Sequence, residues 1–202
     1  ENTGIGVYTY DLARILKEDG FEITVSTGLP HYPWWKFPEE FHDQAAGFHS
    51  KNEINILRSP HFIPTKFNAV QRIKFEISLL FGLALNLIKL RKEKYDAVIA
   101  CIPTVASGYI GLLASLIWKI PFGIIVQDLS GKGAIQSGQT TSKTIGNLAV
   151  SVENFLLKRV SLSVAVSPEI HSYLKELRGE SQVQLIPNYP VVQIEKIAQE
   201  AA

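Results

Sequence analysis

"NTGIGVYTYDLARIL", residues 2–16, places an apolar helical stripe directly behind a threonine and two glycines. The stripe has the spacing of a helix face that packs on a flat surface. Its members are Tyr8, Leu12, Ile15 and Leu16. Gly4 and Gly6 allow close approach of the backbone to a ligand, and a helix N-terminus suits a phosphate. The stretch predicts a helix on a sheet, behind a turn that binds phosphate or only joins helix and strand tightly.

Downstream, short apolar runs alternate with amphipathic segments, which predicts an α/β fold with a Rossmann-like, doubly wound parallel sheet. Expected strands span residues 21–26, 53–60, 95–101, 122–128, 162–167 and 183–190, and expected helices span 67–94, 104–118, 144–160 and 168–177. Residues 29–50 have no clean period and are interpreted as a long functional loop. Because a glycine turn normally follows a buried strand, we also expect an apolar strand of about five to seven residues upstream of Glu1.

The length, hydrophobic fraction, net charge and cysteine count exclude several classes of protein. With 202 residues, 46% of them hydrophobic, the chain can bury a core as one α/β domain or as part of a two-domain enzyme. The net charge of +1 argues against a dedicated nucleic-acid binder. The single cysteine, Cys101, excludes an internal disulfide and is either a buried strand residue or a reactive thiol. No metal-ligand spacing or Walker lysine is present, so we expect no metal and no NTP hydrolysis.

The stretch from Ala97 to Trp118 is uncharged and long enough to raise the question of a membrane span. Pro103, Thr104 and Gly108 interrupt it where a strand would pass into a helix. We therefore expect a buried strand, a turn and a helix capped by Thr104.

Six segments, in this order and spacing, resemble one known family. They are "TGIGVYTYDLARIL", "GFEITVSTGLPHYP", "YDAVIACIP", "GIIVQDL", "VENFLLKRVSLSVAVSPEIHSYL" and "VQLIPNYP". The chain resembles the N-terminal, acceptor-side domain of GT-B glycosyltransferases of family four, specifically the colanic-acid-biosynthesis type. On this resemblance, residues 1–189 form the first Rossmann-like lobe, and residues 190–202 begin a hinge or a following segment.

The resemblance implies a retaining, metal-independent transferase that needs no cofactor besides its nucleotide-sugar substrate. In the family, the first lobe binds a glycan or lipid-linked acceptor, and a second lobe holds most of the donor. The turn of Gly4 and Gly6 would face the cleft between the lobes, close to the donor phosphates. Because the 202 residues resemble the first lobe only, we expect them to be inactive alone.

Candidate site residues follow the predicted strands, because ligands of doubly wound sheets bind beyond the carboxyl ends of the strands. Asp128 is the candidate catalytic base for an acceptor hydroxyl, or else it caps the loop "SGKGAIQSG". Many relatives carry a functional histidine on the corresponding loop, and this chain does not. The substrate-binding candidates are Gly4, Gly6, His31, Tyr32, Gln127, Lys132, Ser167 and Glu169.

Several of these residues also have purely structural interpretations. His31 lies in an aromatic loop, where a histidine often only packs. Ser167 and Glu169 frame a helix start, where serine caps and glutamate favours the helix dipole. Lys132 could meet a phosphate or simply be solvated.

The predicted helix from Phe67 to Lys94 has an apolar middle and basic ends. This pattern suits a peripheral helix on anionic lipid, and family members often use lipid-linked acceptors. The alternative is a core helix with solvated ends. We expect a cytoplasmic protein, which the first of these alternatives would place at the inner membrane face.

Two other functions were considered, and each differs from the glycosyltransferase in one feature of the sequence or gene. A dinucleotide oxidoreductase would need a third glycine, where Thr9 stands, and an acidic residue in place of Ser26 and Thr27. A non-catalytic lobe that only binds acceptor or membrane differs from the enzyme in lacking a donor lobe in its gene.

Overall fold

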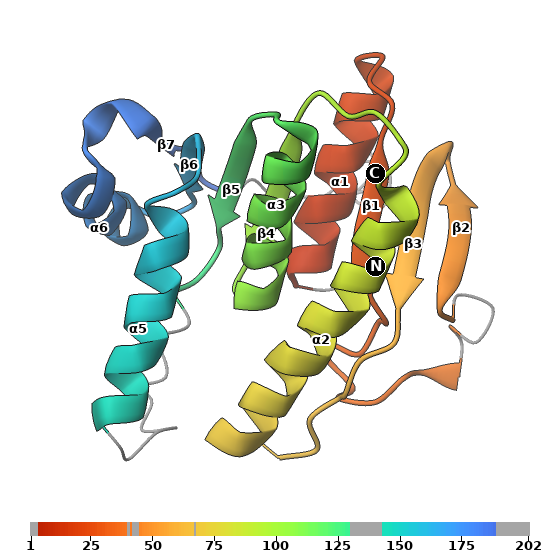
Figure 1. The fold of residues 1–202 in the computed structure, drawn as a ribbon, viewed down its shortest axis with the longest axis horizontal. Coiled ribbons are helices and arrows are strands. Elements are labelled where there is room, and N and C mark those ends of the chain that lie inside the picture. The colour runs from red at the N-terminus through yellow and green to blue at the C-terminus, as the bar shows by residue number, and fades with distance from the viewer. Residues whose placement is uncertain (1–3, 40, 42–44, 67, 130–142, 189–202) are drawn as a thin grey trace, which may run out of the picture.

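The computed structural model describes residues 4–39, 41, 45–66, 68–129 and 143–188. Its helices are α1 (Ile5–Glu18), α2 (Ala69–Leu90), α3 (Val105–Trp118), α5 (Lys143–Leu157), α6 (Pro168–Arg178) and the short 3-10 helix η2 (Glu180–Gln182). Its strands are β1 (Thr24–Gly28), β2 (Gly47–Lys51), β3 (Ile54–Ser59), β4 (Val98–Ile102), β5 (Phe122–Val126), β6 (Leu162–Ala165) and β7 (Val183–Leu185). The predicted α/β alternation is confirmed, with boundaries that shift by a few residues (Figure 1).

The strands form two sheets. One has four parallel strands in the order β4-β5-β6-β7, and the other has three strands in the order β1-β3-β2. In the smaller sheet β1 and β3 are parallel, whereas β2 is antiparallel to β3. Among the described residues no pairing joins β1 to β4. The strand that we expect upstream of Glu1 lies outside the chain and stays a prediction.

Helix α2 connects the two sheets. Asn86, buried on its inner side, donates from Nδ2 to the carbonyl oxygen of Leu57 at 3.1 Å and to Oγ of Ser26 at 3.2 Å, so it binds both β3 and β1. A neighbouring stripe of α2 packs against α3, which in turn covers β4 and β5 (Figure 1). The helix begins at Asn68, whose side chain accepts from the backbone N–H of Gln71.

The core of the four-stranded sheet lies on one of its faces. Ile102, Ile124 and Ala165 are fully buried there together with Leu156 and Leu157 of α5. The stretch from Ala97 to Trp118 forms β4 and α3, as expected. No helix of the described residues is long and apolar enough to cross a bilayer.

The long loop expected at residues 29–50 ends earlier than predicted, because residues from Gly47 onward form β2, which pairs with β3 in a hairpin. Asn52 and Glu53 at the turn have φ angles of 50° and 59°. Such positive values at both central residues are typical of a two-residue hairpin turn. The sequence pattern of β2 hides the strand, because Gly47, Phe48 and His49 do not alternate apolar and polar residues cleanly.

Candidate functional site

The start of α1 meets the loop that follows β1. Gly4 has a φ angle of 63°, and a Cβ atom placed on it would lie 3.1 Å from the ring of Tyr32. A side chain at position 4 would therefore be strained and would push against Tyr32. Gly6 lies in the first turn of the helix, which has no acidic residue and no side-chain cap hydrogen bond. Helix starts of this kind present backbone N–H groups, which suit an anion.

His31 belongs to an aromatic cluster. Its Nδ1 lies 3.0 Å from the carbonyl oxygen of Leu29, and its ring centroid lies 5.0 Å from that of His61 and 5.4 Å from that of Phe75. Nε2 of His61 lies 3.2 Å from the same carbonyl oxygen. These contacts support the packing interpretation of His31, and its substrate role stays a prediction. No sequence pattern indicated His61, because only the fold brings the loop after β3 to this place.

Gln127 and Asp128 follow β5 directly, where strand-end reasoning placed them. Gln127 forms a reciprocal amide pair with Asn188, in which Asn188 Nδ2 donates to Gln127 Oε1 at 2.8 Å and Gln127 Nε2 donates to Asn188 Oδ1 at 3.2 Å. Asp128 is exposed, and its Oδ1 accepts from the backbone N–H of Leu129 at 2.8 Å. The loop that Asp128 would cap, together with Lys132, lies outside the described residues.

Ser167 and Glu169 form the start of α6. Oγ of Ser167 accepts from the backbone N–H of Ile170 at 3.3 Å, which is the expected helix cap. A hydrogen bond from Ser167 holds the pKa of the exposed Glu169 carboxyl below its usual value. The capping alternative is thus observed for Ser167, and Glu169 remains an ionised, solvent-facing carboxylate at the end of β6.

The turn between β4 and α3 is held by α2, which sequence reasoning missed. Arg72 donates from Nη2 to the carbonyl oxygen of Pro103 at 3.1 Å and bridges to Glu76 at 2.7 Å. Glu76 accepts from the backbone N–H of Ala106 at 3.0 Å. Thr104 is the N-cap residue of α3, as expected, but its hydroxyl pairs with that of Ser107 and makes no cap hydrogen bond. Glu76 occupies the amide that Thr104 would have capped.

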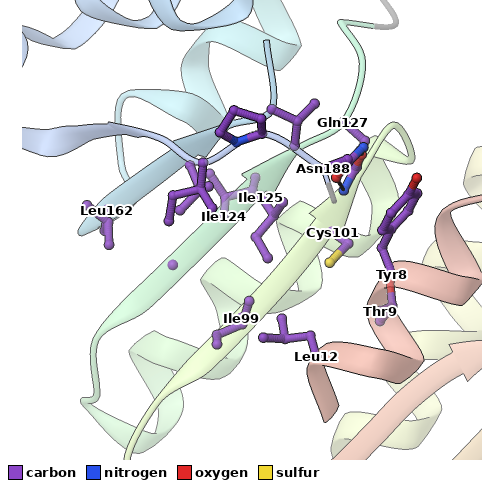
Figure 2. Close-up of a pocket in the computed structure, with 15 residues that line it drawn as sticks. Tyr8, Thr9, Leu12, Ile99, Cys101, Ile124, Ile125, Gln127, Leu162 and Asn188 are labelled. Atoms are coloured by element: carbon purple, nitrogen blue, oxygen red, sulfur yellow. Dashed lines mark hydrogen bonds between the residues drawn. The ribbon is translucent and has the colours of Figure 1, made fainter. Parts of the chain in front are cut away.

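A pocket of about 300 Å³ lies between α1 and the open face of the four-stranded sheet (Figure 2). Its walls are almost wholly apolar and include Leu12, Ile99, Ile125, Leu162 and Val164, with Tyr8, Gln127 and Asn188 at one end. Burial raises the pKa of the Cys101 thiol in its wall, and a hydrogen bond with Thr9 offsets part of this effect. Only the end with Gln127 and Asn188 offers hydrogen bonds to a sugar. Within the described part of the chain, no group of His, Cys, Asp and Glu side chains could hold a metal ion.

Known proteins resemble this chain in sequence. The family model described as "Glycosyl transferase 4-like domain" matches residues 3–189. The Escherichia coli (strain K12) protein named as a colanic acid biosynthesis glycosyl transferase, WcaI, is 30% identical over 110 residues, which are 52% of this chain and 25% of that protein. The chain therefore spans about a quarter of the length of this relative.

Solved structures show the same fold. A portion of sucrose-phosphate synthase from Thermosynechococcus elongatus matches with a TM-score of 0.60 at 14% identity, covering 96% of this chain and 90% of that one. A longer chain of the same enzyme matches with a TM-score of 0.60 at 15% identity, covering 99% of this chain and 47% of that one. At these identities the matches establish the fold alone, which is that of a GT-B lobe.

Proposed function

The chain belongs to the family of glycosyl transferase 4-like domains, and we propose that it is the acceptor-side lobe of a retaining glycosyltransferase. Its donor is a nucleotide-sugar held mainly by a second lobe. Its acceptor is a glycan or a lipid-linked glycan in polysaccharide biosynthesis, at the inner face of an anionic membrane. The family membership and the name of the Escherichia coli relative support this proposal.

One observation carries the proposal: Gly4 holds the start of α1 against Tyr32 of the loop after β1, and within the described residues no side chain caps this start. The backbone amides of the first helical turn and the helix dipole favour the phosphates of a nucleotide-sugar there. The same contacts stabilise the charge that develops on the leaving phosphate during transfer.

The acceptor side of the reaction is assigned to the end of β5. The exposed carboxylate of Asp128 accepts the proton of the acceptor hydroxyl or orients it for attack. Gln127 and Glu169 offer an amide and a carboxylate to further sugar hydroxyls. Retention at the anomeric carbon is proposed from the family resemblance.

The experiment uses the protein that carries these residues together with its second lobe. It is incubated with a panel of nucleotide-sugars and with water-soluble and lipid-linked glycan acceptors, and the linkage is read by NMR. We expect one donor to be transferred with its anomeric configuration kept. An inverted product would overturn retention. Acceptor binding without transfer from any donor would support a non-catalytic binding lobe instead.

A further inference from the structure

The outer side of α2 and α3 has no cover in the described part of the chain. In Figure 1 these helices lie side by side in front of the sheets. Their mutual contact uses Phe75, Leu79, Leu83 and Leu87 of α2 with Ala106, Ile110 and Ala114 of α3. The opposite side of α2 is left to the solvent, although the helix is apolar on that side as well.

Exposed apolar residues recur along the outer side of both helices. Val70, Ile77, Phe81 and Ile88 are spaced by seven, four and seven positions, which aligns them on one line along the helix. Phe81 is 68% exposed and Ile88 is 57% exposed. Leu116 of α3 is 66% exposed. We define the α2–α3 face by Ile77, Phe81, Leu85, Ile88, Leu113 and Leu116.

No charged side chain interrupts this face. Residues 77–88 contain no Asp, Glu, Lys or Arg, which corresponds to about 18 Å of helix. Two polar residues in this stretch make hydrogen bonds inside the protein: Asn86 is buried against β1 and β3, and Ser78 donates to the carbonyl oxygen of Phe75. A surface helix in water normally carries polar residues on its outer side, so this helix is built for an apolar contact.

The charge around the face is strongly positive. Residues 66–94 contain seven basic and two acidic residues, whereas the remaining chain contains 13 basic and 17 acidic residues. One of the two acidic residues, Glu76, is engaged by Arg72 at 2.7 Å. Lys74 stands near one end of the apolar line, and Lys89, Arg91 and Lys92 stand at the other, all exposed. An occupant of this face is therefore apolar in its interior and anionic at its surface.

We propose that the α2–α3 face docks on an anionic lipid bilayer, with Phe81 and Ile88 entering the boundary between headgroups and acyl chains and the basic ends contacting the headgroups. A helix that lies in this plane buries its apolar side about 5–10 Å deep. The exposed side chains project from the outside of two helices, and such a ridge enters a fluid lipid surface without a preformed groove. Charge complementarity favours anionic over neutral lipid.

The first turns of α2 connect the proposed docking face with the strand-end side of the fold. Arg72 and Glu76, in the first two turns of α2, hold Pro103 and Ala106 at the end of β4. The docked face thus continues directly into the side where the acceptor is proposed to bind. The link to a lipid-linked acceptor rests on the proposed function, whereas the docking itself does not.

The test measures binding of the purified full-length protein to vesicles by flotation, without donor or acceptor. Vesicles contain phosphatidylcholine with or without phosphatidylglycerol. We expect binding only to the anionic vesicles and weaker binding at high salt. Phe81→Ser should reduce binding about tenfold or more. Phe48→Ser is the matched control, because Phe48 is 62% exposed on β2 and lies outside the face.

The charge arm changes Lys89, Arg91 and Lys92 to glutamine, which should weaken binding about a hundredfold. The matched control changes three exposed lysines elsewhere, Lys36, Lys51 and Lys158, and should weaken binding far less. Thermal melts confirm that each variant is folded.

Equal binding by Phe81→Ser and Phe48→Ser overturns the proposal, as does equal binding to neutral and anionic vesicles. Self-association that Phe81→Ser abolishes, without vesicle binding, overturns it in favour of a second copy of the chain. A protein that binds vesicles but transfers no sugar contradicts only the proposed function. Conversely, transfer to a water-soluble acceptor by a protein that does not bind vesicles contradicts the docking and the membrane location, but not the transferase activity.

Discussion

Asp128 combines exposure with a position directly after β5, and this makes its substitution informative. In the complete enzyme, Asp128→Asn keeps the size and the hydrogen bond that Asp128 Oδ1 accepts from Leu129, but it removes the base. We expect turnover to fall about a hundredfold or more while the melting temperature stays nearly unchanged. Asp96→Asn, at an exposed position before β4, is the matched control and should transfer normally. Near-normal turnover of Asp128→Asn would reduce Asp128 to a structural residue.

Cys101 provides a residue-scale prediction that depends on pH. Burial raises the pKa of its thiol, so less reactive thiolate is present at neutral pH than in an unfolded chain. We expect iodoacetamide to alkylate the native protein more slowly than the denatured protein at pH 7, with a rate that keeps rising above the usual thiol pKa. The raised folded-state pKa also means that stability is lost as the pH rises above the unfolded value. Faster labelling of the native protein would indicate an activated thiol.

Single residues show what strand-end reasoning could and could not predict. Gln127, Asp128 and Ser167 lie where the rule of parallel sheets put them, because sequence position fixes which residues follow a strand. His61 and Glu76 were not predicted as site residues. Their roles depend on contacts with Leu29 and Ala106, which are residues far away in the sequence. Only tertiary packing makes such contacts.

Helix α2 illustrates how packing can reverse an intrinsic propensity. A Gly-to-Ala change inside a helix stabilises it by about 1 kcal/mol when space allows. At Gly82, however, a Cβ would lie 2.7 Å from Oγ of Ser59 and 2.8 Å from the backbone oxygen of Pro60. We expect Gly82→Ala to destabilise the protein by about 1–3 kcal/mol in urea titrations.

The comparison for this change is Ser172→Ala on α6, where Ser172 is exposed and its hydroxyl donates only to the carbonyl oxygen of Pro168 in the same helix among the contacts described. This variant should stay within about 0.5 kcal/mol of the parent. A Gly82→Ala variant as stable as the parent would show that α2 moves away from β3 without cost. The tie between α2 and the smaller sheet would then be weaker than the contacts of Asn86 indicate.

Whole elements were more predictable than their contacts. The apolar period of α1 and Pro168 at the start of α6 are local signals, and both helices form where these signals place them, whereas α2 begins two residues after the expected Phe67. Strand β2 was missed, because its stability comes from pairing with β3 rather than from its own pattern. Pairing across a hairpin is decided by the turn at Asn52 and Glu53.

At the scale of the whole molecule, the sequence predicted the fold class, while the division into two sheets was not predicted. The unjoined edges of β1 and β4 would cost about 1–3 kcal/mol for each buried backbone group without a partner. Helix α2 links the two sheets instead, because Asn86 binds β1 and β3 of the smaller sheet and a neighbouring stripe of α2 packs against α3, which covers the larger sheet. A strand between β1 and β4 remains our prediction for the natural protein.

The strand-end side of this lobe is exposed to solvent. Gly4, Tyr32, Asp128, Glu169 and Asn188 are all exposed, so this lobe alone does not exclude water from a donor sugar. Transfer to an acceptor needs a closed, preorganised site, because water competes with the acceptor hydroxyl. We therefore expect residues 1–202 to show no turnover with any nucleotide-sugar, whereas the same residues joined to a second lobe do. The assay follows released nucleotide and glycosylated acceptor, and circular dichroism verifies that the short chain is folded. Turnover by the folded short chain would mean that one lobe suffices for catalysis.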